Sequence, residues 1–244
     1  MKHRLILLLL AMASLASCQE RPVSKSKTMP APDRAAAAEA NVRPALERDL
    51  AALGLHYGDP VFLRAFKEER ILELWLRKRE NGKFELFRTY PIAAASGDLG
   101  PKIKEGDGQV PEGFYHVPPG AMNSNSIYHL AFNIGFPNAH DRSLGRTGSF
   151  IMVHGGSVSI GCLAMTDAKI EEIYSLCAAA HQAGQPFFRV HLFPFRMSAA
   201  RLAQEEHSPH ASFWKNLKEG HDQFENEKVP PDTQAANGSY TFKE

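Results

Sequence analysis

The stretch Phe150–Asp167 has the sequence FIMVHGGSVSIGCLAMTD, and it decides the fold and the site. Its first residues are apolar and favour a β-strand. Glycines and small hydroxyl residues follow, and a cysteine comes directly after a glycine. His154 precedes Cys162 by eight positions, and the glycines between them allow the chain to fold back. The imidazole of His154 could therefore reach the sulfur of Cys162.

A cysteine beside a histidine is the pair that thiol nucleophilic catalysis needs. A free thiol is mostly protonated at neutral pH, with a pKa of about 8.5, and a nearby imidazole can accept its proton and stabilise the thiolate. Gly161 would let a substrate carbonyl approach the backbone, and amide groups around Gly161 and Cys162 could face the developing oxyanion. The alternative is a buried structural cysteine with a histidine satisfied in a core.

The wider string combines His154-Gly155, Ser159–Cys162 and Met165–Asp167. It resembles the L,D-transpeptidase catalytic (YkuD) family of bacterial cell-wall enzymes. It is most similar to the YafK-type branch, which includes murein L,D-transpeptidases and an enzyme that cuts lipoprotein from the wall. The common family pattern has a longer gap between histidine and cysteine, and a second histidine where this chain has Ile160. The resemblance is strongest in Ser96–Tyr115 and in the stretch around Cys162.

The resemblance implies a mainly β fold with flanking α-helices, a YkuD-like β-sandwich. It also implies an enzyme that acts on peptidoglycan stem peptides containing diaminopimelate. Cys162 would be the nucleophile and form a thioester, and His154 would accept and donate the proton. The carbonyl of Gly155 would orient the imidazole, and Gly161 would lie in the oxyanion region. This chemistry needs no metal and no organic cofactor.

Other polar residues are candidates for supporting roles. Ser157 or Ser159 could assist by hydrogen bonding. Arg142 and Arg146 could bind a carboxylate of the peptide stem, because arginine offers a planar bidentate fork. Scaffold salt bridges explain both arginines equally well. His129 could lie near the site, and the alternative is a strand histidine bonded at the sheet surface.

The sequence leaves the acceptor of the acyl group open. An amine attacking the thioester gives an L,D-transpeptidase, whereas water gives a hydrolytic amidase that releases wall-linked lipoprotein from diaminopimelate. A non-catalytic wall-binding lipoprotein would not need an activated thiol. A papain-like peptidase would have its cysteine near the mature N-terminus and its histidine far downstream. A zinc site from His129, His140 and His154 lacks the usual ligand spacing.

The segment Met1–Cys18 predicts a secretory signal. After a basic head, the apolar stretch Leu5–Ala13 is too short to span a bilayer as a helix. Leu15–Cys18 resembles a bacterial lipobox, so Cys18 would be lipidated, and an ordinary cleavage site is the alternative. Gln19 then resembles the outer-membrane sorting pattern of Gram-negative lipoproteins. We expect a periplasmic protein that is lipid-anchored to the outer membrane.

The 244 residues allow one medium domain with extensions. A formal net charge of +1 gives no indication of nucleic-acid binding, and three cysteines are too few for a disulfide framework. After the signal at 1–18, the segment 19–54 is expected to hold a flexible tether up to about Arg34 and then a helix over Ala35–Leu53, which Gly54 would end. This helix would pack beside the domain without a chemical role. The catalytic domain would occupy 55–197. A helical extension and a polar tail with a loose end would occupy 198–244.

Within the domain, apolar alternation predicts strands at 61–66, 71–76, 84–92, 128–134 and 187–194. The first of these are expected to be antiparallel with one buried face. Thr166 or Asp167 would cap a helix that has Cys177 in its apolar stripe. The glycine-rich Ser96–Tyr115 lacks the phosphate-loop pattern. Its Lys102, Lys104 and Asp107 could contact substrate, and a solvated loop is the alternative.

Overall fold

The computed structural model describes residues 31–236 and 238–243. The predicted signal, the lipidation of Cys18 and the tether up to residue 30 lie outside the described residues and stay predictions. Within the described ranges, no helix is long and apolar enough to cross a membrane.

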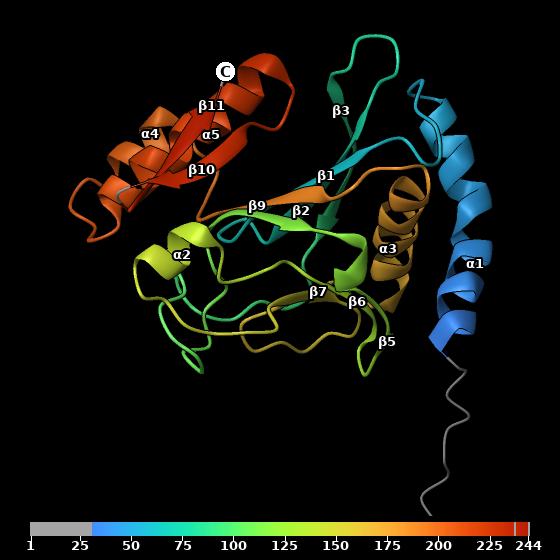
Figure 1. Ribbon diagram of the computed structural model, residues 1–244, viewed down its shortest axis with the longest axis horizontal. Helices are drawn as coiled ribbons and strands as arrows, with labels where there is room; N and C mark the ends of the chain where they lie inside the picture. The colour runs from blue at the N-terminus through green and yellow to red at the C-terminus, as the bar shows by residue number, and fades with distance from the viewer. Residues whose placement is uncertain (1–30, 237, 244) are drawn as a thin grey trace, which may run out of the picture.

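Two sheets build the central part of the fold (Figure 1). The larger sheet has five strands in the order β3-β2-β1-β9-β4, and the smaller has four in the order β5-β6-β7-β8. The strands are β1 (Val61–Phe66), β2 (Ile71–Arg77), β3 (Phe84–Pro91), β4 (Gly113–Val117), β5 (Met122–Ser126), β6 (His129–Asn133), β7 (Met152–His154), β8 (Leu163–Ala164) and β9 (Phe188–Phe193). The predicted class, mainly β with flanking helices, is confirmed.

Helices flank these sheets on two sides (Figure 1). They are α1 (Ala31–Ala51), α2 (Ala139–Ser143), α3 (Asp167–Gln182), α4 (Ala199–Ala203) and α5 (Ala211–Glu227), with a short 3-10 helix η1 (Pro119–Ala121). The first helix ends as its sequence predicts, because Gly54 takes the left-handed conformation with φ +69°. The Leu55 amide then donates to the Leu50 carbonyl (3.0 Å), and both leucines are buried. Helix α1 packs against α3 and β5.

Strand β1 is buried along its whole length, so the expectation of one buried face is wrong for this strand. It pairs antiparallel with β2 and parallel with β9. Leu63 faces the main core, which includes residues of α3 and the smaller sheet. Phe62 faces the other way and contacts Phe224 of α5, with ring centroids 4.8 Å apart. The C-terminal elements cover the face that local alternation assigned to solvent (Figure 1).

The C-terminal tail also differs from its prediction, because most of it is folded. Strands β10 (Asp232–Ala236) and β11 (Ser239–Lys243) form an antiparallel pair, so the expected loose end is wrong for the described residues. Tyr240 anchors the pair. It is buried, and its ring stacks on His140 at 4.2 Å and meets Phe114 edge-on at 4.8 Å.

His191 lies buried between the larger sheet and the C-terminal elements. Its ring contacts Phe62 and Phe114, with centroids 4.6 and 4.7 Å away. Neither ring nitrogen has a hydrogen-bond partner among the described residues. Burial, together with the charges of Arg189 and Arg64, holds the pKa of His191 well below its ordinary value. The folded protein therefore keeps this ring neutral.

This buried ring predicts acid sensitivity. The unfolded chain binds a proton at His191 below about pH 6.5 and the folded chain does not, so stability is lost as the pH falls. From about pH 7 to about pH 5, we expect this histidine to lower the free energy of unfolding by up to about 1.4 kcal/mol per pH unit. Denaturant unfolding across this range measures the slope. His191→Phe should make it shallower, whereas His207→Ala, at an exposed histidine, should not. Equal slopes for all three proteins would contradict the prediction.

Candidate active site

The glycine turn after β7 returns the chain to β8 alongside it. The two strands pair in parallel, with Val153 opposite Leu163 and His154 opposite Ala164. Paired residues share a face, and so do alternate residues of one strand. Cys162 immediately precedes β8, and its thiol accepts a hydrogen bond from the Met152 amide, two residues before His154 on β7. Val153 and Leu163 face away from His154, into the core.

The turn itself tolerates only glycine at its first position. A Cβ atom on Gly155 would lie 2.6 Å from Oδ1 of Asp167 and 2.7 Å from the carbonyl oxygen of Tyr128. Gly156 has φ +71°, and its amide donates to Oδ1 of Asp167 (2.7 Å). The predicted cap of α3 is therefore different in the structure. Thr166 occupies the cap position without a side-chain hydrogen bond, and the Asp167 carboxylate holds the turn instead.

His154 is oriented by its own turn. Its Nδ1 lies 2.6 Å from the carbonyl oxygen of Gly155, so Nδ1–H donates there and Nε2 keeps a free lone pair. The Tyr128 ring stacks over the imidazole at 4.6 Å. Burial lowers the pKa of His154 below its ordinary value, and the bond to Gly155 opposes this only in part. At neutral pH the imidazole is thus a neutral proton acceptor.

The Cys162 thiol contacts main-chain groups in this structure. The Met152 amide donates to Sγ (3.4 Å), and the thiol donates to the carbonyl oxygen of Phe150 (3.6 Å). Burial raises the pKa of the thiol, while the Met152 amide and the positive charge of Lys102 oppose that rise. Within the described part of the chain, no hydrogen bond joins the thiol to His154. The resting pair is therefore a neutral thiol and a neutral imidazole.

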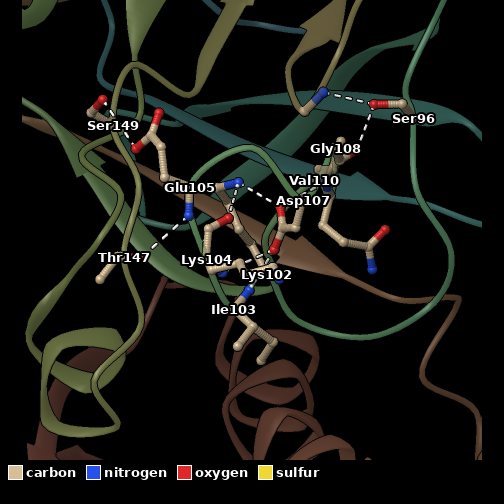
Figure 2. Close-up of polar contacts among 12 residues, drawn as sticks. Ser96, Lys102, Ile103, Lys104, Glu105, Asp107, Gly108, Val110, Thr147 and Ser149 are labelled. Carbon is tan, nitrogen blue, oxygen red and sulfur yellow. Dashed lines mark hydrogen bonds and ion pairs between the residues drawn. The ribbon is translucent and has the colours of Figure 1, made fainter.

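The two amides of the predicted oxyanion region are both bound by serine hydroxyls. The Gly161 amide donates to Oγ of Ser96 (2.7 Å), whose own hydroxyl donates to the carbonyl of Gly108 (2.6 Å; Figure 2). The Cys162 amide donates to Oγ of Ser159 (3.0 Å). Ser159 thus hydrogen-bonds within the site, and its assistance to the reaction stays a prediction. Ser96, from a loop far upstream, was not predicted as a site residue.

Lys102 is enclosed in that same loop rather than available to substrate. It is 4% exposed, and its Nζ donates to Oδ1 of Asp107 (2.6 Å) and to the carbonyl of Lys104 (3.0 Å; Figure 2). Burial alone would raise the pKa of Asp107, but Lys102 and neighbouring backbone amides hold it below its usual range. Of the three candidates for substrate contacts, Lys102 and Asp107 therefore bind each other, and Lys104 contributes its main-chain carbonyl to Lys102.

Removing the charge of Lys102 should make Cys162 less reactive at neutral pH. We expect Lys102→Met to raise the pKa of the Cys162 thiol by about one pH unit, because an opposite charge nearby favours the thiolate. The pH dependence of alkylation by iodoacetamide measures this shift. Lys104→Met is the matched control, since its contact to Lys102 is made by the main chain. If the alkylation rates of wild type and Lys102→Met depended on pH in the same way, Lys102 would have no effect on the pKa of the Cys162 thiol.

A cavity of about 800 Å³ lies next to Cys162, because its lining includes Phe150 and Met152, whose main-chain groups contact the thiol. Neither Cys162 nor His154 is itself in the described lining. The lining also includes Asn133, which pairs with Met152 across β6 and β7. Because Met152 alternates with His154 along β7, these two side chains share a face of the strand. Arg142 also lines the cavity, and its guanidinium donates to the carbonyl of Pro137. The structure therefore places Arg142 where a substrate carboxylate could reach it.

The other two candidates for substrate binding have partners within the protein. Arg146 is buried, with Nη1 2.9 Å from Oδ1 of Asp141 and its guanidinium over the Phe213 ring at 5.0 Å. The structure thus assigns Arg146 to the scaffold. Nε2 of His129 lies 2.9 Å from Oε1 of Glu171. The His129 side chain is therefore paired with Glu171 rather than with the thiol of Cys162.

Two other possibilities were a metal site and a second nucleophilic cysteine, and neither has a suitable site in the described ranges. No three potential metal ligands among His, Cys, Asp and Glu come together there. His140, for example, contacts the carbonyl of Gly238 through Nε2 (3.1 Å). Cys177 is fully buried in α3, and burial raises the pKa of its thiol far above the ordinary value. It is therefore an apolar core residue rather than a second nucleophile.

Comparisons with known proteins agree on one family. Residues 63–189 match the YkuD family, described as the L,D-transpeptidase catalytic domain. YafK of Escherichia coli strain K12, whose name assigns it provisionally to the L,D-transpeptidases, is 44% identical over 183 residues, 75% of this chain and 74% of that protein. YafK of Escherichia coli O157:H7 matches to the same extent.

Solved structures with a similar arrangement are more distant in sequence. A variant of the helical cell shape determining protein Pgp2 from Campylobacter jejuni has a TM-score of 0.46 at 21% identity, covering 73% of this chain and 63% of that one. Bd1075 from Bdellovibrio bacteriovorus has a TM-score of 0.38 at 20% identity, covering 68% and 58%. This chain thus spans less than two thirds of these two solved chains.

Proposed function

Since the chain belongs to the YkuD family of L,D-transpeptidase catalytic domains, we propose that it is a cell-wall enzyme that acts on peptidoglycan stem peptides. The proposed reaction proceeds through a thioester on Cys162, formed at a bond to diaminopimelate. The observation that carries the proposal is that the Cys162 thiol contacts the main chain of β7 at Met152, two residues from His154, beside a cavity of about 800 Å³ that Met152 and Phe150 line. A buried structural cysteine would need neither the histidine nor the cavity.

The first half of the proposed reaction uses the neutral pair. The Cys162 thiol transfers its proton to Nε2 of His154, whose other nitrogen is held by the Gly155 carbonyl. The thiolate attacks the amide carbonyl carbon, and a C–S bond forms while the carbonyl oxygen takes the negative charge. The intermediate collapses when the C–N bond breaks. The imidazolium gives its proton to the leaving amine, and the acyl group remains on sulfur.

The oxyanion of this step requires hydrogen-bond donors. The Cys162 amide belongs to the residue that carries the sulfur, and Ser159, which now occupies it, is only partly buried. A substrate oxygen can take the place of this hydroxyl. The Gly161 amide is held more firmly, because the Ser96 hydroxyl is fixed in turn by Gly108. We therefore infer that the Cys162 amide stabilises the oxyanion while Ser96 keeps the turn in place.

The cavity supports a substrate that carries a carboxylate. Arg142 is the arginine in its lining, and the described lining residues include no acidic side chain. Asn123, Asn133 and Asn138 add neutral hydrogen-bonding groups. A stem peptide with a free carboxylate and several amides fits this set of groups.

The second half of the reaction decides between two proposed products. An amine that attacks the thioester forms a new peptide bond, which is L,D-transpeptidation. Water that attacks it gives a free carboxylate, and on a lipoprotein-linked stem this releases the lipoprotein. Cys162 is only half-buried, so either attacking group can approach. We propose that the reaction takes place in the periplasm, with the enzyme anchored to the outer membrane by a lipid on Cys18.

Mass spectrometry of wall fragments tests the proposal. Wild type and Cys162→Ala are incubated with stem peptides, including stems that carry a linked lipoprotein peptide. Crosslinked dimers with wild type alone identify a transpeptidase, and loss of the linked peptide without dimers identifies a releasing amidase. Unchanged fragments with both proteins would overturn the enzymatic proposal and leave a non-catalytic wall-binding lipoprotein.

A further inference from the structure

The turn between β5 and β6 covers the proposed base. Ser126 and His129 pair at its ends, and Ile127 and Tyr128 lie between them. The Tyr128 ring stacks on His154 at a centroid distance of 4.6 Å, with 31° between the planes. Tyr128 is 39% exposed, whereas His154 is 2% exposed. Tyr128 therefore forms part of the cover that separates the imidazole from solvent.

This turn is held from outside by Arg34, in the first turns of α1. The Nη1 of Arg34 donates to the carbonyl oxygens of Ser126 (2.8 Å) and His129 (2.7 Å), the two residues at the ends of the turn. His129 has φ +68°, a left-handed conformation that is unfavourable for a residue with a side chain. The shape of the turn thus depends on contacts made by other segments, and Arg34 supplies two of them.

Helix α1 also reaches the side chain of His129. Asn41 donates through Nδ2 to Oε2 of Glu171 (3.2 Å), and Oε1 of Glu171 contacts Nε2 of His129 (2.9 Å). Both the main chain and the side chain of His129 are therefore tied to α1. This helix precedes the residues that match the family, 63–189.

We propose that Arg34 is a positioning residue for the base. It fixes the Ser126–His129 turn so that Tyr128 remains stacked on His154 and limits the access of water to the imidazole. The inference rests on the proposed function, in which His154 is the base, and it assigns that base a support outside the family's matched region. Arg34 contacts neither His154 nor Cys162, and it acts through the turn.

Loss of this support has a specific electrostatic consequence. The titratable groups nearest this turn are Tyr128, which contacts the His154 ring, and Asp167 and His129, which both lie against Gly155, with Glu171 paired to His129. The Cys162 thiol is bound at Met152, two residues before His154. Burial is the main cause that lowers the pKa of His154. A displaced Tyr128 would admit water to the ring, and the pKa would then rise towards its ordinary value.

Histidine NMR titration of the protein tests the inference without any substrate. We expect Arg34→Ala to raise the titration midpoint of His154 by about half a pH unit or more and to lower kcat by about 10- to 100-fold. Arg34→Lys, which keeps a cationic donor, should restore most of the wild-type titration midpoint of His154 and most of the wild-type kcat. Arg48→Ala is the matched control on the same helix, because Arg48 is exposed and pairs only with its neighbour Asp49. The His154 resonance is identified by its loss in His154→Gln.

A second variant tests whether Arg34 acts through Tyr128. Tyr128→Ala should shift His154 as Arg34→Ala does, and the double variant should shift it no further, since both changes remove the same cover. An unchanged His154 titration in Arg34→Ala, or additive shifts in the double variant, would overturn the inference. A wild type inactive on stem peptides would refute the proposed function, and the titration would still decide the role of Arg34.

Discussion

Replacement of Cys162 by alanine is expected to abolish turnover of stem peptides, lowering kcat by about 10⁴-fold or more. Alanine offers no atom that can form the thioester, while the cavity keeps its lining and still binds substrate. His154→Gln should lower kcat to a similar level. The double variant, with both Cys162 and His154 replaced, should have a kcat no lower than that of either single variant, because nucleophile and base act as one unit. Steady-state kinetics on a synthetic stem peptide measures all three.

Intact-protein mass spectrometry gives the same prediction a direct readout. An acyl adduct should accumulate on wild type when the attacking amine is withheld, and it should be missing from Cys162→Ala. Cys177→Ala is the matched control, because this thiol is buried in α3 and inert. It should form the adduct as wild type does. An adduct on Cys162→Ala, or its loss in Cys177→Ala, would show that another residue is the nucleophile.

Replacement of Lys67 by methionine is expected to destabilise the fold by about 3–5 kcal/mol, because it leaves a buried carboxylate without its cation. Nζ of Lys67 is 3.0 Å from Oε1 of Glu112 and donates to the carbonyls of Gly100 (2.7 Å) and Val110 (3.0 Å). Glu112 is fully buried, and its Oε2 accepts from Nε1 of Trp214 (2.7 Å). This network joins β1, the glycine-rich loop and α5.

Two further variants separate the loss of charge from other effects. The double variant Lys67→Met and Glu112→Gln should recover part of the lost stability, because a neutral amide is far less costly to bury than an unpaired carboxylate. Lys218→Met breaks a surface pair with Asp222 on α5 and should cost no more than about 0.5 kcal/mol. Denaturant unfolding measures the free energies. A loss below about 1 kcal/mol for Lys67→Met would contradict the prediction.

What the sequence predicted well depends on neighbouring residues. The apolar run before His154, the glycine turn and the cysteine after glycine lie within one stretch, and they suffice to place His154 on β7 and Cys162 directly before its partner strand β8. Gly54 ends α1 for a similarly local reason, since the left-handed conformation that terminates the helix is a property of this one residue. The alternation of apolar residues likewise located most strands, because alternate residues of a strand point to the same face and those on the inward face are apolar.

What the sequence did not reveal depends on segments that meet only in the fold. Ser96 binds the amide of Gly161 across 65 residues, and nothing in the local pattern distinguishes it from another loop serine. Arg142 and Arg146 are four residues apart and of one type, yet one lines the cavity and the other lies under Phe213. Arg34 was expected in the flexible tether, and this is wrong, because it lies in α1. Its contact with the β5–β6 turn requires knowing which surface the helix covers.

The resting state of Cys162 also bears on how its free thiol would resist oxidation in the periplasmic location that we propose. An exposed, low-pKa cysteine is open to oxidation and mixed-disulfide formation in an oxidising compartment. Here burial raises the pKa of the thiol, and its proton is shared with the carbonyl of Phe150. Cys177, the other free cysteine, is buried where no disulfide partner can approach. A nucleophile that ionises only when it passes its proton to His154 would remain reduced between turnovers, without a dedicated reductant.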